Sequence, residues 1–428
     1  MDVIVNTLSE VSREVEITAS AVEVQPHFEK KYQEYRAKVE IHGFRKGKAP
    51  LDVVKKLYGE LIEQDSLQDV ATDLYRQAVV DKDLKPIGDP SLVDMNFRRG
   101  EELRFKVRYD IRPTVTLKTY GGLKVRKPMH VVTDEEVQTE LLRLRRANAT
   151  FEPAAAAADD EHVITADLQD VDAQGMPLIG KRRENVRFYL ADDELEDPFK
   201  EALRGTTAGQ DHRIQFEHDH GDHKHSVNTR VSVKKVEKVA LPPFDDVFVK
   251  KATKDKVATT DEFLKNLRND IVAYWKSKSE RSLLNNLTGE LLKLHEFGVP
   301  DSLTRAVLEG LLQDMAQQYP KKQLPADFDY ERFGQENFPY AQAQAKWALL
   351  REELLKAEGI AVEDADLEKL AEAESATIQI DKDRLLQYYR SSDQVRDRLM
   401  SDKLMQRLLE KITVEEVEET TEPHATKG

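Results

Sequence analysis

The chain has 428 residues, of which 34% are charged and 39% hydrophobic, and its formal net charge is -15. This length predicts two to four domains rather than a single core. The sequence contains no cysteine, which excludes disulfides, thiolate metal sites and cysteine nucleophiles and fits a reducing compartment. No apolar run approaches the roughly 18 residues of a membrane span, and the first residues lack the features of a signal peptide. We therefore expect a cytoplasmic protein with no membrane partner.

Residues 1–112 have the pattern of a compact α+β unit. The run Glu102–Ile111 alternates apolar and polar residues, which predicts a half-buried strand. Shorter alternating runs at Val3–Val5 and Val15–Ile17 are expected to join the same sheet.

Two helices are expected between these strands, with a projecting loop between them. His27–Glu40 has aromatic residues at helical spacing, and a second helix is expected to begin after Pro50, whose ring suits the first turn of a helix. The segment Ile41–Ala49 then forms a tip that joins the two helices. Its two glycines give the backbone freedom to turn.

The composition of this tip first suggests a phosphate cradle, because it combines glycines with lysines. A P-loop needs four residues between its first glycine and the Gly-Lys pair, followed by a hydroxyl residue. Only three residues separate Gly43 from Gly47, and Ala49 stands at the hydroxyl position. The P-loop interpretation is therefore excluded. In an acidic chain, any contact with nucleic acid has to come from a local basic patch such as this one.

Beyond residue 112 the sequence pattern changes three times. A linker-like stretch ends in an amphipathic helix, short alternating runs follow, and long amphipathic helices fill the rest before an acidic tail that is expected to be disordered. The alanine-rich run Glu152–His162 is interpreted as a low-complexity connector. The predicted parts are the head at 1–112, the linker with the first helix of the helical body at 113–150, the β-rich insert at 151–240, the helical body at 241–414 and the tail at 415–428.

Three stretches of the sequence resemble bacterial trigger factor. They are GFRKGKAP followed by VVKKLYG (43–59), the segment Lys85–Pro128, and FGVPDSLTRAVLEGLL (297–312), and the order of the predicted parts agrees over nearly the whole chain. The resemblance implies a multidomain α+β fold. Its parts are an α+β ribosome-binding head, a small β-rich domain of the FK506-binding-protein type, and a large all-helical chaperone domain that is discontinuous in sequence.

The resemblance also implies a function, which is to bind nascent and unfolded polypeptides near the exit tunnel of the large ribosomal subunit without ATP or any cofactor. It implies contacts of the head with ribosomal protein and rRNA, and a homodimer away from the ribosome is left open. Carried over by position, the ribosome-binding residues are Gly43, Phe44, Arg45, Lys46, Gly47, Lys48 and Pro50.

The chemistry of the tip is compatible with this role. Its cations can pair with rRNA phosphates or protein carboxylates, and Phe44 can fill an apolar socket. The alternative is that Phe44 folds back on its own helices and the cations are only solvated. In the helical body, the candidates for a client-facing surface are Leu311, Met315, Trp347 and Leu350, but plain core is the favoured interpretation of such stripe positions.

The β-rich insert shows few of the aromatic residues that proline isomerisation needs. That reaction requires an aromatic-lined pocket that desolvates and twists the X–Pro amide, rather than an acid or a nucleophile. The resemblance places an aromatic residue where this chain has a leucine after Asp167. We expect an isomerase-type fold of doubtful activity, and the alternative is a second substrate-contact surface. The pocket candidates, each of which can equally be core, are Leu168, Phe188, Phe199 and Phe216.

Four histidines within eight residues are weak candidates for a zinc or nickel site: His218, His220, His223 and His225. We favour a polar loop instead, because tight sites usually draw their ligands from separate rigid elements. Two rival functions remain, a free soluble peptidyl-prolyl isomerase whose helical domain recruits substrate, and a metal-handling protein. Both leave the basic tip unexplained.

Overall fold

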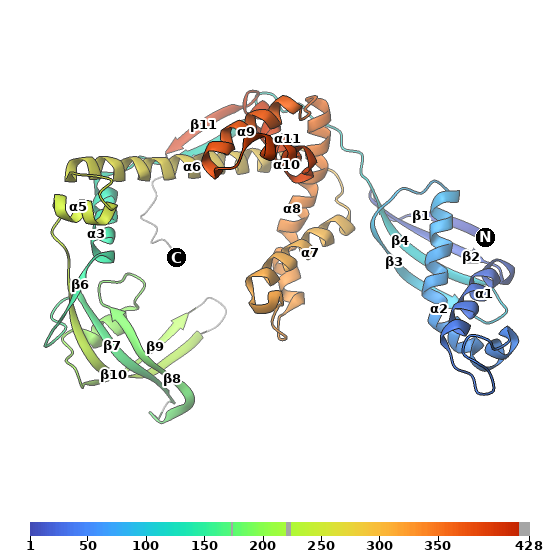
Figure 1. The fold of residues 1–428 in the computed structure, drawn as a ribbon, viewed down its shortest axis with the longest axis horizontal. Coiled ribbons are helices and arrows are strands. Elements are labelled where there is room, and N and C mark those ends of the chain that lie inside the picture. Colours follow the sequence, from blue (N-terminus) through green and yellow to red (C-terminus); the bar gives the residue numbers. More distant parts are fainter. Residues whose placement is uncertain (173, 220–223, 419–428) are drawn as a thin grey trace. The chain divides into compact units, whose positions relative to one another are not determined.

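The computed structural model describes residues 1–172, 174–219 and 224–418 (Figure 1). The chain divides into two compact units. The first consists of Met1–Val125 with Leu284–Glu415, and the second is built mainly from Arg126–Leu283. The first unit contains an α+β head and most of the long helices, and the second contains a β-rich domain. This is the multidomain α+β fold that the sequence predicts.

The head contains an antiparallel sheet of four strands, in the order β1 (Asp2–Thr7), β2 (Ser12–Ala19), β4 (Leu103–Ile111) and β3 (Pro86–Phe97). The alternating run predicted as a strand forms β4, whose core-facing side chains Leu103, Phe105, Val107 and Tyr109 are all buried. The two shorter runs also join the sheet, since β2 pairs with β4 and β1 pairs with β2.

Two helices cover this sheet. Helix α1 (Ala21–Lys38) begins before the predicted start at His27, because Ser20 and Glu23 form a capping box in which the Ser20 N–H donates to the Glu23 carboxylate over 2.9 Å. Helix α2 (Leu51–Asp81) begins directly after Pro50, as predicted.

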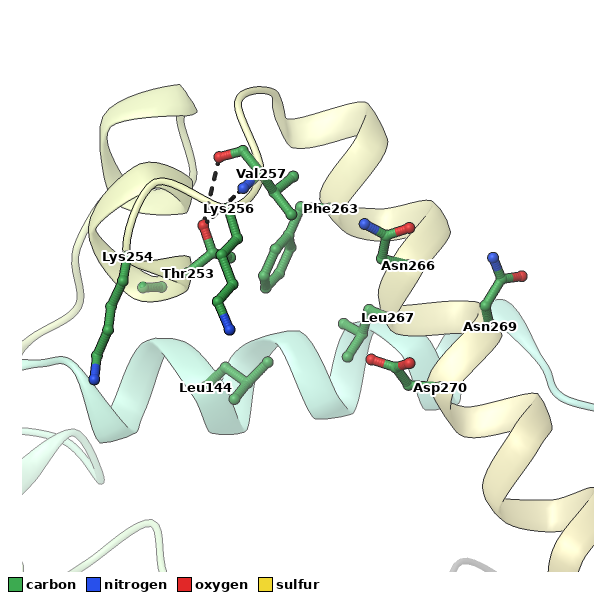
Figure 2. Close-up of a pocket in the computed structure, with 11 residues that line it drawn as sticks. Leu144, Thr253, Lys254, Lys256, Val257, Phe263, Asn266, Leu267, Asn269 and Asp270 are labelled. Atoms are coloured by element: carbon green, nitrogen blue, oxygen red, sulfur yellow. Dashed lines mark hydrogen bonds between the residues drawn. The ribbon is translucent and has the colours of Figure 1, made fainter. Parts of the chain in front are cut away.

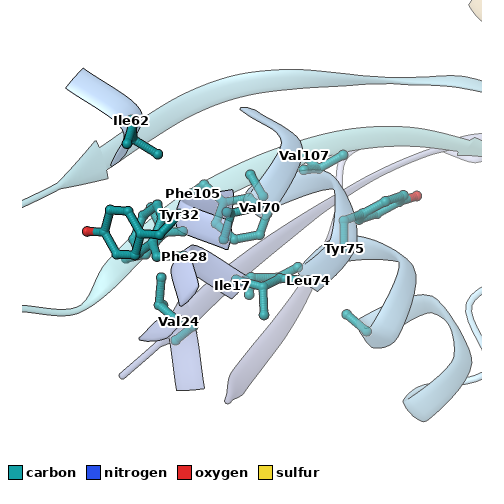
Figure 3. Packing of buried hydrophobic residues seen from close by; sticks show 14 of the residues in the cluster. Ile17, Val24, Phe28, Tyr32, Ile62, Val70, Leu74, Tyr75, Phe105 and Val107 are labelled. Atoms are coloured by element: carbon teal, nitrogen blue, oxygen red, sulfur yellow. The ribbon is translucent and has the colours of Figure 1, made fainter. Parts of the chain in front are cut away.

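One apolar core joins the two helices to the sheet (Figure 3). Aromatic residues of α1 and aliphatic residues of α2 meet the inward side chains of β2 and β4. The members that fix this packing are Ile17, Val24, Phe28, Tyr32, Val70, Leu74 and Phe105. Their burial removes apolar surface from water, at about 1.5–3 kcal/mol for each large side chain.

The β-rich domain of the second unit is an antiparallel sheet. Four strands follow the order β6 (Thr150–Pro153), β10 (Lys224–Ala240), β7 (His162–Val171) and β8 (Pro177–Tyr189), and a fifth strand, β9 (Asp211–Asp219), pairs with β10. A short helix, α4 (Asp197–Leu203), packs against β9. The alanine-rich run is not a connector, contrary to the prediction. Ala157 is fully buried in the core of this domain, and its N–H donates to the Thr206 carbonyl over 2.9 Å.

Helices on both sides of this domain in the sequence pack together. Helix α3 (Asp134–Ala147) precedes it, and α5 (Asp246–Thr253) and α6 (Thr260–Leu294) follow it. They share one apolar cluster of buried residues, which are Val137, Leu141, Phe248, Val249, Phe263 and Leu267. The helical body is therefore discontinuous in sequence, as predicted.

The first unit also contains the later helices α7 (Asp301–Gln318), α8 (Tyr330–Ala357), α9 (Asp364–Ile378), α10 (Lys382–Ser391) and α11 (Asp393–Leu409), with a short 3-10 turn at Pro320–Lys322. The predicted tail is partly ordered, because β11 (Thr413–Glu418) pairs with β5 (Lys124–Met129). Of the helices in the described ranges, none is long and apolar enough to cross a membrane.

Candidate functional site

The loop Ile41–Pro50 between α1 and α2 is built from two turns of the same form. In the first, Ile41–Phe44, and in the second, Arg45–Lys48, the N–H of the last residue donates to the carbonyl of the first over 2.9 Å. The third residue of each turn is a glycine with a positive φ, +87° at Gly43 and +77° at Gly47. A turn of this type requires a positive φ at that position, which favours glycine. The sequence thus fixes the shape of the loop through its two glycines.

The ends of the loop are anchored while its middle is exposed. Ile41 is 7% exposed and Ala49 is 4% exposed, and both belong to the head core. Phe44 is 41% exposed and lies outside that core. The ring is thus partly covered and partly exposed, and the choice between a ring that binds a partner and one that folds back on its own helices stays a prediction. An exposed aromatic side chain at the tip of an anchored loop is available to a partner surface.

The cations of this loop are also available. Arg45, Lys46 and Lys48 are exposed, and none forms a salt bridge with a carboxylate in the part of the chain that the structure describes. In the flanking helix α1, by contrast, Lys31 lies 2.6 Å from a carboxylate oxygen of Asp69, and this partner raises the pKa of Lys31. The loop therefore presents positive charge that the head itself does not neutralise.

A polar contact between three segments holds the stem of this loop. Tyr32 of α1 donates its hydroxyl to the Glu63 carboxylate of α2, and the Arg99 guanidinium approaches the other oxygen at 3.2 Å. Burial and the neighbouring Glu63 raise the pKa of Tyr32 to about 12. Glu63 is buried, so the loss of either partner leaves a charged group under-satisfied. Sequence reasoning missed this cluster, since its members carry no local pattern.

The four pocket candidates of the β-rich domain lie in one apolar cluster. Phe188 stacks on Phe199 with ring centres 5.4 Å apart, and Phe199 meets the edge of Phe216 at 5.9 Å. Leu168 and Phe188 are buried, and the other two rings are half-buried. The structure thus brings the candidates together, and Phe199 contacts both of the other rings.

Asp167, a buried acidic residue of this domain, is engaged in structural contacts. Its carboxylate accepts hydrogen bonds from Lys234 at 2.6 Å, from Arg182 at 2.9 Å and from the backbone N–H of Asn185 at 3.0 Å. These donors, Lys234 above all, hold the pKa of Asp167 well below its usual range. These contacts lie where the pairing of β7 with β8 shifts register, between Ala166 and Leu168, and Asn185 on β8 has a φ of +55° there.

The predicted histidine run lies largely outside the described residues. His220 and His223 and the side chains of His218 and His225 lie outside the described part, while the backbones of His218 and His225 pair across β9 and β10. The metal site there stays a prediction. Elsewhere in the described ranges, no group of three or more acidic or histidine side chains is arranged to hold a metal ion.

A cavity of about 780 Å³ opens between α3, α5 and the start of α6 (Figure 2). Leu144 of α3 and Phe263 and Leu267 of α6 form its apolar side, and Lys254 and Lys256 lie near the other side. The Thr253 hydroxyl donates to the Val257 carbonyl and accepts from the Val257 N–H. These two hydrogen bonds order the loop that carries the two lysines. The cavity combines an apolar floor with a polar rim, as sites for short peptide segments do.

The helices α7 and α8 pack against each other and leave aromatic side chains exposed. Phe338 and Tyr340 of α8 are 41% and 54% exposed. Of the predicted client-facing residues, Leu311, Met315 and Trp347 are half-buried. Leu350 is fully buried on the inner side of α8, which confirms the plain-core interpretation for that residue.

Comparisons with known proteins point to one family. A model described as bacterial trigger factor protein matches residues 1–144, and a second, for the C-terminus of the same protein, matches 259–413. The trigger factor of Chloroherpeton thalassium is 31% identical and covers 86% of this chain and of its own length. That of Salinibacter ruber is 28% identical over 97% of this chain and 94% of its own length. A solved structure of the trigger factor chaperone is 22% identical, covers 96% of this chain and 98% of its own, and has a TM-score of 0.47.

Proposed function

Because the chain belongs to the trigger factor family, we propose that it is an ATP-independent, ribosome-associated chaperone. It binds nascent and unfolded polypeptides near the exit tunnel of the large ribosomal subunit, in the cytoplasm. The head, linker, β-rich domain and helical body predicted from the sequence are its functional parts. The observation that carries the proposal is the exposed, unpaired state of the loop between α1 and α2.

The loop fits a mixed surface of protein and rRNA. Arg45, Lys46 and Lys48 supply positive charge for phosphates or carboxylates, and the guanidinium can bind either group in a bidentate way. Phe44 supplies an apolar anchor at the tip. Since the net charge of the whole chain is -15, the remaining surface does not supply this attraction to RNA.

Client binding is proposed for the helical body. Exposed aromatic side chains, Tyr319 directly after α7 and Phe338 and Tyr340 of α8, offer apolar contacts that suit many sequences. Weak and numerous contacts allow release without an energy source. The cavity beside Leu144 and Phe263 adds a second place for an apolar side chain of the client.

The ribosome contact is tested by cosedimentation with bacterial 70S ribosomes through a sucrose cushion at physiological salt. The test variant carries Phe44→Ala, Arg45→Ala and Lys46→Ala together. The wild type is expected to pellet with ribosomes, and the variant is expected to stay in the supernatant.

A matched control removes one exposed apolar side chain and two exposed cations elsewhere on the head, with Val22→Ala, Lys30→Ala and Lys82→Ala. Circular dichroism first establishes that all three proteins fold. If the control is lost from the pellet as well, or if the test variant still pellets, the loop is not the ribosome anchor. The free isomerase then becomes the hypothesis to test.

We also propose that the β-rich domain has the isomerase-type fold of the family but isomerises proline slowly. The argument is that Phe199 packs against both Phe188 and Phe216, and Leu168 replaces the aromatic residue expected at its position. A refolding assay limited by proline isomerisation measures this directly. A rate enhancement comparable to that of an efficient isomerase would contradict it.

A further inference from the structure

The outer edge of β8 is unusual for a strand of a small domain. Nine consecutive residues, Pro177–Asn185, are exposed, and their ladder with β7 is interrupted between Pro177 and Arg182, where Gly180 has a φ of +80°. Strand β8 ends the path β6–β10–β7–β8, so its outer backbone groups have no strand partner in the described parts of the chain. Exposed N–H and C=O groups on such an edge are a template for another extended chain.

The start of this edge is apolar. Ile179 is fully exposed, Met176 is 65% exposed and Leu178 is 38% exposed. Turns and hairpin ends are usually built from polar residues and glycine. Three large apolar side chains grouped at one hairpin end therefore indicate a surface that another apolar group covers.

The next part of the edge is positively charged. Lys181 and Arg183 are exposed and form no salt bridge with a carboxylate in the described ranges, whereas Arg182 is held 2.9 Å from Asp167 and 3.3 Å from Glu184. Arg183 pairs with Leu168 of β7, and Lys181 directly precedes Arg182, where this pairing resumes, so the two free cations lie close together in sequence along the edge.

The simplest explanation of these cations is protection, because lysine and arginine on an edge strand discourage pairing with other strands. That explanation accounts for Lys181 and Arg183 but not for the exposed group of Met176, Leu178 and Ile179. We therefore infer that the cations and the apolar group together select a binding partner, rather than only preventing strand pairing. They repel a second copy of the same positive edge, and they attract an extended chain that is both apolar and acidic.

We propose that β8 binds extended, apolar and acidic segments of unfolded clients by adding them as a strand to its outer edge. This inference rests on the proposed chaperone function and names the class of client segment that the β-rich domain takes. Backbone hydrogen bonds along Pro177–Asn185 supply affinity that is independent of sequence. Selectivity comes from apolar side chains beside Leu178 and Ile179 and from acidic side chains beside Lys181 and Arg183.

The experiment uses the full chain and a fluorescein-labelled peptide of six Val-Glu repeats, with a peptide of six Val-Lys repeats as its counterpart. Fluorescence anisotropy at low salt gives the affinities, and hydrogen–deuterium exchange locates the bound peptide. The Val-Glu peptide is expected to bind and to slow exchange in the β8 segment. The double variant Lys181→Glu/Arg183→Glu is expected to bind Val-Glu at least about five-fold more weakly and to bind Val-Lys more tightly than wild type does. Local misfolding would lower the affinity for both peptides. A switch of preference from Val-Glu to Val-Lys therefore distinguishes charge recognition from misfolding.

The control variant Arg230→Glu/Lys238→Glu makes the same change of charge on β10, an inner strand, at exposed positions without salt bridges in the described parts of the chain. It is expected to retain the wild-type preference. Equal losses in both double variants would mean that only net charge matters, which overturns the proposal.

Other occupants of the edge give other results, each of which overturns the proposal. If β8 is protected without peptide and loses this protection on dilution, the occupant is a second copy. If ribosome pelleting is lost in the Lys181→Glu/Arg183→Glu variant, the edge contacts the ribosome. If the Val-Glu peptide binds but protects only the helices, the chaperone function stands and the edge is not a client site. If no peptide binds and the chain also fails to suppress aggregation of an unfolded protein, both proposals fail.

Discussion

Replacing Gly43 by alanine separates the shape of the basic loop from its chemistry. Gly43 has a φ of +87°, and a Cβ built on it meets no atom within 4 Å, so the substitution adds backbone strain without a clash. Holding a residue other than glycine in this region costs roughly 1–2 kcal/mol. If the free loop releases this strain and the ribosome binds the loop in the turn conformation, the whole cost appears as about a five- to thirty-fold weaker affinity.

The assay is a titration of labelled chain with ribosomes, combined with urea unfolding of the same variant. Strain that the free loop retains appears in the unfolding free energy, and strain that the free loop releases appears in the affinity. The two losses together are expected to reach about 1–2 kcal/mol. The control is Gly122→Ala, since Gly122 in the linker also has a positive φ of +78° and open space around it. A full wild-type affinity and stability for Gly43→Ala, or an equal loss of affinity for Gly122→Ala, would refute the reasoning.

Two further predictions concern contacts within the first unit. Glu358, whose side chain is 5% exposed, accepts hydrogen bonds from Lys411 at 2.6 Å and from the Tyr120 hydroxyl, and Lys411 above all lowers its pKa from the usual 4.5. Glu358→Gln is expected to lower the unfolding free energy by about 1–3 kcal/mol at pH 7. Because the folded pKa is depressed, this stabilisation is present above pH 4.5 and is lost as the pH falls through the folded pKa, so urea unfolding at neutral and acidic pH should show wild type and variant converging. Gly88→Ala is expected to cost more than about 2 kcal/mol in thermal unfolding, because Gly88 has a φ of +63° and its Cβ would lie 2.4 Å from the Ser302 Cβ. A variant as stable as wild type would mean that Gly88 of β3 and Ser302 of α7 do not lie this close together.

The sequence predicts the parts of the fold whose packing follows a short period. Glu102–Ile111 alternates cleanly, and it forms β4 with alternate side chains buried. Pro50 and the apolar spacing after it predict the start of α2 correctly. The loop between Ile41 and Pro50 is predicted from its charges and glycines, and the structure adds the two turns that shape it.

Other elements depend on contacts that no local pattern records. Strand β3, Pro86–Phe97, has no alternating burial and contains Gly88, so periodicity does not reveal it. Ala157 belongs to an alanine-rich run whose composition is typical of a linker, yet neighbouring strands bury it completely. Leu350 and Leu311 both occupy apolar positions of helices, and only packing decides that the first is buried and the second half-exposed.

The same limit applies to the candidate site. Phe44 and its neighbouring cations stand out in the sequence because an aromatic residue and positive charge are unusual together at a loop tip. Tyr32, Glu63 and Arg99, which hold the stem of that loop, do not stand out, since each comes from a different segment and gains its role only from the fold.

The central claim, that the loop tip contacts the ribosome, is tested most directly by photo-crosslinking from the tip. A photoreactive phenylalanine analogue, p-benzoylphenylalanine, replaces Phe44, and in a matched variant it replaces Val22, which is 79% exposed on the same head. The Phe44 variant is expected to crosslink to a component of the large ribosomal subunit, and the Val22 variant is not. Crosslinks from position 44 only within the chain itself, or the same ribosomal crosslinks from both positions, would contradict the account.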